Sequence, residues 1–146
     1  MLALGCDHGG FCLLRDVMAY LDAHNIPYKD FGTFSEDSCD YPVIAEPVAR
    51  AVADKTFEKG ILICGTGIGM SIAANKIPGI RAALCGDTYS AEMTRRHNDA
   101  NILALGARVV GSGLALKIVE TFLQTPFDGG RHQRRIDILR TLETGK

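Results

Sequence analysis

Three glycines at alternate positions mark the segment Cys64-Gly65-Thr66-Gly67-Ile68-Gly69, which ends a run of apolar residues. Between a buried strand and a helix, such a loop lets backbone N–H groups converge on an anion. The third glycine comes too early for the Gly-x-Gly-x-x-Gly dinucleotide fingerprint, and no Gly-Lys-Ser/Thr ending of a P-loop follows. A tight turn that needs small residues would show the same glycines, so an anion site and a simple turn are equal alternatives here.

Cys64 favours the anion site over a simple turn, and it adds a side chain that could take part in a reaction. A thiol beside oriented amides and a helix N-terminus ionises more readily than a free cysteine, and the thiolate can serve as base or nucleophile. Five cysteines without a Cys-x-x-Cys pair indicate reduced thiols rather than a disulfide framework or a zinc ribbon. The remaining four are interpreted as small buried apolar residues, namely Cys6, Cys12, Cys39 and Cys85.

Two histidines stand where a proton carrier and an anion contact could lie. Asp7-His8 follows the first apolar run, and His97-Asn98-Asp99 closes an expected helix before the last run. We expect both segments near the same sheet edge, where they could act together. Aspartate, histidine and cysteine could instead bind a metal, which ranks lower because no His-x-x-x-His or Cys-x-x-Cys spacing fixes a ligand pair.

Three arginines occur within the five residues Arg131-His132-Gln133-Arg134-Arg135, directly after Gly129-Gly130. Such a run is most often the solvated start of a helix. Arg131 and Arg135 are four residues apart on one helical face, so they could grip a phosphate together while Arg134 points elsewhere. An anionic ligand would offset the unfavourable position of these charges at a helix N-terminus.

Short apolar runs alternate with segments of helical period, which indicates a mostly parallel sheet with helices on both faces. Each run suits a buried strand: residues 2–5, 28–31, 61–64, 81–84 and 102–105. Helices are expected from residue 11 to near 25, after Tyr41-Pro42, over 70–76, 90–97 and 114–124, and in the tail 131–146. The predicted fold is a Rossmann-like three-layer α/β sandwich with five strands, in which ligands bind beyond the carboxyl ends of the strands.

Length and composition predict one domain over residues 1–146. The formal charge is −1, which argues against broad charge-driven binding to nucleic acid or to an anionic membrane. No signal peptide and no apolar stretch of roughly 20 residues are seen, so we expect a cytoplasmic protein. In the tail, Ile136, Leu139 and Leu142 recur at helical spacing and need a surface to cover them, on this domain or on a partner subunit.

Several segments together resemble the ribose-5-phosphate isomerase B family, which forms one superfamily with the lactose-operon galactose-6-phosphate isomerase subunits. The resemblance runs in order from about Leu4 to Arg135 over Gly5-Cys6-Asp7-His8-Gly9-Gly10-Phe11, Asp40-Tyr41-Pro42, Cys64-Gly65-Thr66-Gly67-Ile68-Gly69, Ala73-Ala74-Asn75-Lys76, His97-Asn98-Asp99 and Gly129-Gly130-Arg131-His132. It implies interconversion of D-ribose 5-phosphate and D-ribulose 5-phosphate without a metal or an organic cofactor. It also implies a homodimer or homotetramer whose active sites are shared between two subunits, which would give the C-terminal helix its partner.

The resemblance also implies a role for each matching residue. Cys64 would be the base that moves a proton between C1 and C2, since Met70, where one branch of the family has a carboxylate base, cannot take a proton. Thr66 and the loop amides would hold the enediolate as an oxyanion hole, and His97 would open the furanose ring. The other implied contacts are Asp7 and Asn98 to sugar hydroxyls, Gly65, Gly67, Ile68 and Gly69 to the enediolate, and His8, Arg108, Arg131 and Arg135 to the phosphate.

Three other functions stay open on the sequence. Within the superfamily, a longer pocket would take a six-carbon substrate such as allose 6-phosphate or galactose 6-phosphate. A non-catalytic sugar-phosphate or nucleotide sensor would use the loop and the arginines without turnover, although a sensor has no need of a reactive thiol beside its anion site. A metal-dependent hydrolase is the least favoured alternative.

Overall fold

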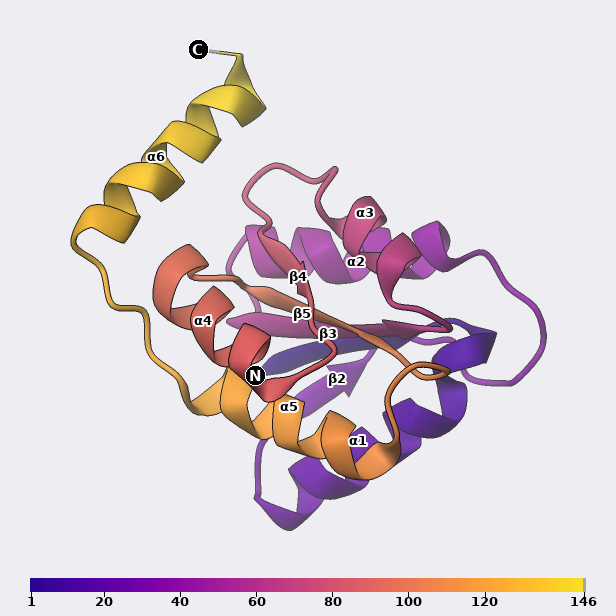
Figure 1. Ribbon diagram of the computed structural model, residues 1–146. Coiled ribbons are helices and arrows are strands. Elements are labelled where there is room, and N and C mark those ends of the chain that lie inside the picture. Colours follow the sequence, from indigo (N-terminus) through magenta and orange to yellow (C-terminus); the bar gives the residue numbers. More distant parts are fainter. Residues whose placement is uncertain (146) are drawn as a thin grey trace.

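A computed structural model describes residues 1–145, and five parallel strands form their centre (Figure 1). In chain order these are β1 (Leu2–Cys6), β2 (Tyr28–Asp30), β3 (Lys59–Cys64), β4 (Ala82–Leu84) and β5 (Ile102–Gly106). Their spatial order is β2-β1-β3-β5-β4, and every neighbouring pair is parallel. The connections change direction between β1 and β3, so this pair forms the switch point at which such sheets bind ligands. The predicted α/β class and the five parallel strands are confirmed.

Helices cover both faces of the sheet. On one face pack α1 (Phe11–Ala23), which follows a short 3₁₀ turn η1 (His8–Gly10), α4 (Thr88–Asn98) and α5 (Ser112–Gln124). On the other face pack α2 (Tyr41–Ala53) and α3 (Ile68–Ala74) (Figure 1). α4 begins earlier than predicted because the Asp87 carboxylate accepts a capping hydrogen bond from the Ser90 N–H at 2.6 Å. None of the helices within residues 1–145 has the length and hydropathy needed to cross a membrane.

The central and the edge strands differ in burial, which corrects part of the prediction. All residues of β1 and β5 are buried, and so is β3 after its first residue. β2 and β4 are not buried strands: each is three residues long and partly exposed, with Leu84 at 43% exposure. The cause is their place in the sheet, because an edge strand has a neighbour on one side only.

α6 (Arg131–Thr144) stands apart from the two helical layers (Figure 1). Ile136 is buried where α6 meets α4, and the Gly79 N–H donates to the Glu143 carboxylate at 3.0 Å near the other end. Leu139 and Leu142 are 48% and 75% exposed. This chain therefore covers only part of the predicted apolar seam, and the last residue of the predicted tail, 146, lies outside the described residues.

Candidate active site

Cys64 is the last residue of β3, and its side chain lies in the turn that leads into α3. The Gly67 N–H donates a hydrogen bond to the Cys64 Sγ, with 3.1 Å between nitrogen and sulfur. The residue is 5% exposed. The turn therefore places a backbone donor against the atom that carries the negative charge of a thiolate.

Gly67 meets the requirement for a tight turn. Its φ is 79°, a left-handed conformation that residues with side chains rarely adopt. A Cβ at this position would lie 2.5 Å from the Leu84 Cδ1 and 2.8 Å from the carbonyl carbon of Leu105. The tight-turn interpretation is thus correct for this glycine, and it does not compete with an anion site, because the turn is what exposes the loop amides.

The same turn leaves hydrogen-bond donors free. The Ile68 N–H donates to the Thr66 Oγ1 at 3.2 Å, so the Thr66 hydroxyl hydrogen remains available to another acceptor. Within residues 1–145, the N–H groups of Gly65 and Thr66 donate to no backbone or side-chain acceptor. Hydrogen-bond donors without a partner, placed around a thiol, are arranged as in an oxyanion hole, where such donors stabilise a developing negative charge.

β1 brings Asp7 and His8 to this edge of the sheet. The Asp7 N–H donates to the Ile63 carbonyl at 3.1 Å, which ties the end of β1 to the end of β3. The Asp7 Oδ1 accepts from the two glycine N–H groups that follow His8, at 2.9 and 3.1 Å. The His8 Nδ1 accepts from the Cys39 N–H at 3.3 Å. In the neutral imidazole of His8 the proton therefore lies on Nε2, where it can be donated to a ligand.

Arg108 reaches the glycine loop from the segment after β5. Its N–H donates to the Gly65 carbonyl at 2.9 Å, and its Nη1 lies 3.0 Å from where a Cβ on Gly65 would be. Its guanidinium forms no salt bridge with any other residue in the described range 1–145. Free cations beside free backbone donors suit a phosphate group. We call Asp7, His8, Cys64, Thr66 and Arg108 the Cys64 cluster.

His97 and Asn98 lie at the amino ends of the strands, opposite to Cys64, so the expectation that both segments lie near the same sheet edge of one chain is wrong. α4 starts beyond the carboxyl end of β4 and runs back along the sheet, so its last turn reaches the amino ends of the strands. There the Nε of Arg81, the residue before β4, donates to the Asn98 carbonyl at 2.9 Å. Because strands rise about 3.3 Å per residue, roughly 15 Å of sheet separates the two edges.

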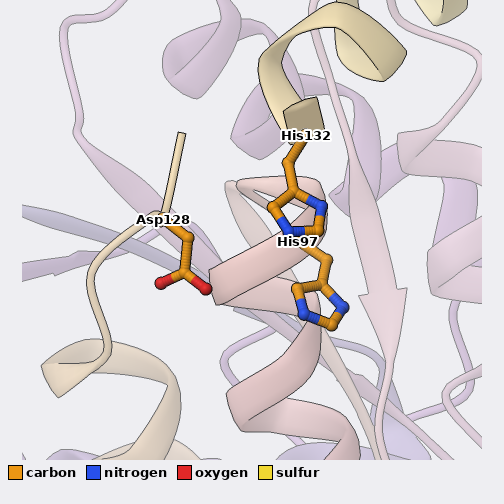
Figure 2. A group of neighbouring side chains, drawn as sticks. All are labelled: His97, Asp128 and His132. Atoms are coloured by element: carbon orange, nitrogen blue, oxygen red, sulfur yellow. The ribbon is translucent and has the colours of Figure 1, made fainter. Parts of the chain in front are cut away.

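A second group of predicted site residues gathers around His97. The ring of His132, in the first turn of α6, stacks on that of His97 with 4.3 Å between centroids and 13° between planes (Figure 2). Burial, and then the charges of His97, Arg131 and Arg135, lower the pKa of His132. Arg131 and Arg135 are exposed and form no salt bridge within residues 1–145. We call His97, Asn98, Arg131, His132 and Arg135 the His97 cluster.

Sequence reasoning assigned no role to His132 or Tyr41. His132 and Ile136 are four residues apart and both buried, so their helical spacing was an available signal that His132 faces the body of the chain. The Tyr41 ring lies over the glycine loop, where a Cβ on Gly69 would approach it to 2.7 Å. That contact joins α2 to α3 and carries no local signal in the sequence.

The chain is similar to sugar-phosphate isomerases over most of its length. Residues 2–139 match the family described as Ribose/Galactose Isomerase. Ribose-5-phosphate isomerase B of Escherichia coli strain K12 is 49% identical over 142 residues, 97% of this chain and 95% of that protein. D-erythrulose-4-phosphate isomerase of Pectobacterium atrosepticum is 40% identical over 137 residues, 93% of this chain and 90% of that protein. The structure of Clostridium thermocellum ribose-5-phosphate isomerase B matches with a TM-score of 0.97 at 51% identity, covering 99% of this chain and 97% of that one.

Proposed function

Because the chain belongs to the Ribose/Galactose Isomerase family, we propose that it is an aldose–ketose isomerase that interconverts D-ribose 5-phosphate and D-ribulose 5-phosphate. The observation that carries this proposal is the Cys64 cluster, where a thiol, backbone donors and the Arg108 guanidinium, the last two without partners among residues 1–145, meet at the switch point of the sheet. A proton carrier, an oxyanion hole and a phosphate contact are what this isomerisation needs.

Cys64 carries the proton in this proposal. As a thiolate it removes the proton from C2 of the open-chain aldose, and the electrons of that bond form a C1–C2 double bond. The carbonyl oxygen on C1 becomes the negative oxygen of an enediolate, to which the Gly65 N–H, the Thr66 N–H and the Thr66 hydroxyl donate. The hydroxyl proton on O2 moves to O1, and the thiol returns its proton to C1, which yields the ketose. No covalent bond to the substrate forms.

The phosphate and the sugar hydroxyls bind away from the reacting carbons. His8, through its Nε2–H, and Arg108 hold the phosphate, and the carboxylate of Asp7 accepts from a sugar hydroxyl. These contacts position C1 and C2 against the thiol without taking part in the proton transfer.

The second half of each site comes from a partner subunit in this proposal. The His97 cluster is roughly 15 Å of sheet away from the Cys64 cluster of its own chain, so one chain cannot apply both to one sugar phosphate. In a two-fold homodimer, each chain lends its His97 cluster to the other chain's Cys64 cluster. There His97 opens the furanose ring, Asn98 contacts a hydroxyl, and Arg131 and Arg135 join the phosphate.

Exposed apolar surface at both edges supports this pairing. Ile68 and Ile72 on α3 are 51% and 54% exposed beside the glycine loop. Near the His97 cluster, Leu139 and Leu142 on α6 are 48% and 75% exposed, and a cavity of about 410 Å³ that Leu139 helps to line lies between α6 and the rest of the chain. A homodimer is the smallest assembly that completes two sites, and a homotetramer would contain the same pair.

We place this activity in the cytoplasm, in a single domain over residues 1–146. All five cysteines are free thiols, a state that a reducing compartment preserves.

Turnover of D-ribose 5-phosphate in the presence of a chelator tests the base. The variant Cys64→Ala should lower kcat by roughly 10²–10⁴-fold, the usual contribution of a general base, while calorimetry shows that it still binds the substrate. Cys12→Ala is the matched control, because the Cys12 thiol is exposed and bonds to Glu36 instead. Near-normal turnover of Cys64→Ala would remove Cys64 from the mechanism.

Comparison of substrates tests how many carbon atoms the sugar of the preferred substrate has. We expect the highest kcat/KM for D-ribose 5-phosphate, against D-erythrulose 4-phosphate, which names the Pectobacterium relative, and D-allose 6-phosphate. Preference for a four- or six-carbon sugar phosphate would keep the mechanism and change the substrate. If the folded protein binds these sugars without exchanging the proton on C2 with solvent, it is a sensor and not an isomerase.

A further inference from the structure

Three side chains with metal-binding atoms meet beside α4. His97, Asp128 and His132 each offer one ligand atom, and these atoms all lie within 4.8 Å of one another (Figure 2). They are the one such group of three or more histidine, cysteine, aspartate and glutamate side chains within residues 1–145. Figure 2 shows the Asp128 carboxylate lying to one side of the two stacked rings.

The backbone holds the three residues close together. The Asp128 N–H donates to the Arg96 carbonyl at 3.1 Å, which fixes this segment next to the last turn of α4. His132 is buried in the first turn of α6, and its N–H donates to the Gly129 carbonyl at 3.1 Å. The ligand atoms start within 4.8 Å of one another, and side-chain rotation would have to bring them to the roughly 2.0–2.2 Å from the metal at which Zn²⁺ binds histidine nitrogen and carboxylate oxygen.

The ligand types point to a transition metal. Imidazole suits Zn²⁺, Cu²⁺ and Ni²⁺ better than the hard cations Mg²⁺ and Ca²⁺, which prefer oxygen. The Asp128 carboxylate is available as a metal ligand, because within residues 1–145 it has one salt bridge, to the Arg96 Nη1 at 3.7 Å. The charges of Arg131 and Arg135 next to His132 oppose a cation, which makes this a reversible site rather than a permanent structural one.

We propose that His97, Asp128 and His132 form a reversible binding site for Zn²⁺ and similar divalent transition metals, and that the bound metal inhibits the isomerase. A metal on His97 takes up one ring nitrogen and lowers the basicity of the imidazole, so the ring can no longer accept and donate the proton that ring opening requires. The inhibition rests on the proposed function of His97, whereas the binding itself does not.

Metal binding is measured on the assembled Cys12→Ala/Cys64→Ala enzyme, which lacks the exposed thiol and the thiol of the proposed base as competing ligands. Calorimetric titration with ZnCl₂ should show one site per chain, and CoCl₂ should give the absorption of a low-symmetry Co²⁺ site without a thiolate charge-transfer band. Asp128→Ala and His132→Gln should each weaken Zn²⁺ binding by more than about tenfold, since even supporting residues of metal sites contribute that much. His24→Gln, which changes a histidine at the far end of α1, should bind as before.

Unchanged Zn²⁺ affinity in both Asp128→Ala and His132→Gln would overturn the site, and so would a thiolate band with CoCl₂. Asp128→Ala is the informative variant for inhibition, because Asp128 lies outside both proposed clusters and the variant should keep its turnover of D-ribose 5-phosphate. We expect it to need at least about tenfold more ZnCl₂ than the unmodified enzyme for half-inhibition, the same factor as for binding. Equal inhibition of the two enzymes would overturn the inhibitory role, whatever the binding data show.

Discussion

Arg95 is a buried guanidinium that joins two chain segments next to the His97 cluster. It donates to the Asp99 carboxylate at 2.8 Å, to the Ala100 carbonyl at 2.7 Å and to the Thr125 carbonyl at 3.1 Å. The first two acceptors lie in the turn between α4 and β5, and the third lies just after α5. The hydrogen bonds of one side chain thus fix the turn that follows His97, and they satisfy carbonyls that would otherwise be left without a donor.

Replacement of this guanidinium should lower the stability of the folded chain. Arg95→Met keeps most of the side-chain volume but removes the donors, and we expect it to lower the free energy of unfolding by about 3 kcal/mol. Urea denaturation of the variant measures this change. Arg96→Met is the control, because Arg96 forms exposed ion pairs that are worth at most about 1 kcal/mol. An equal loss in both variants would contradict a special role for Arg95.

Gly67→Ala tests the turn that holds Cys64. The positive φ and the contacts with Leu84 and Leu105 both oppose a side chain, so we expect a loss of about 2 kcal/mol in the free energy of unfolding together with a drop in kcat. Gly113→Ala is the matched control, since a Cβ on Gly113 in α5 meets nothing within 4 Å and alanine favours a helix. Stability equal to the unmodified chain would show that the turn accepts a side chain.

At the scale of elements, the direction of α4 separates what could be predicted from what could not. Cys64 was located because the loop chemistry follows β3 directly in the chain, and strand ends stay neighbours in space. His97 was misplaced because the eleven residues of α4 carry the chain roughly 16 Å back along the sheet. The burial of β2 and β4 was also misjudged, since burial of a strand depends on having neighbours on both sides.

Two cysteines near strand ends should make stability depend on pH. Burial, and then the charge of Asp30, raise the pKa of Cys6 to about 12, while burial and the charge of Asp87 raise that of Cys85 to about 11. Both values exceed the 9.0 of an unfolded chain, so the folded state retains these protons longer than the unfolded state. Their contribution is complete below pH 9 and is lost as pH rises toward the raised values.

The expected loss is about 1.4 kcal/mol per pH unit for each thiol above pH 9. Denaturation at pH 8 and at pH 10.5 measures it, and the variant Cys85→Ala should show a smaller decrease between the two pH values than the unmodified chain. An identical decrease would assign the effect to other groups.

At the scale of the whole molecule, the proposed homodimer with shared sites can be tested by mutating each half-site separately. Chains with Cys64→Ala and chains with His97→Asn should each be nearly inactive alone. When they are unfolded, mixed in equal amounts and refolded, half of the dimers are hybrids, each with one intact site, so activity should return to roughly a quarter of the unmodified level. No recovery in a mixture that refolds and pairs would show that each site lies within one chain.

The two outer strands of the sheet, β2 and β4, also affect how neighbouring molecules meet. An edge strand presents unpaired N–H and C=O groups that another strand can join, which makes long edges a starting point for aggregation. Both edge strands here are three residues long, and β2 consists of Tyr28, Lys29 and Asp30, two of them charged. The outer strands therefore offer few unpaired backbone groups to the sheet of another molecule. At high protein concentration, we expect molecules to associate through their helices and loops and not by strand pairing.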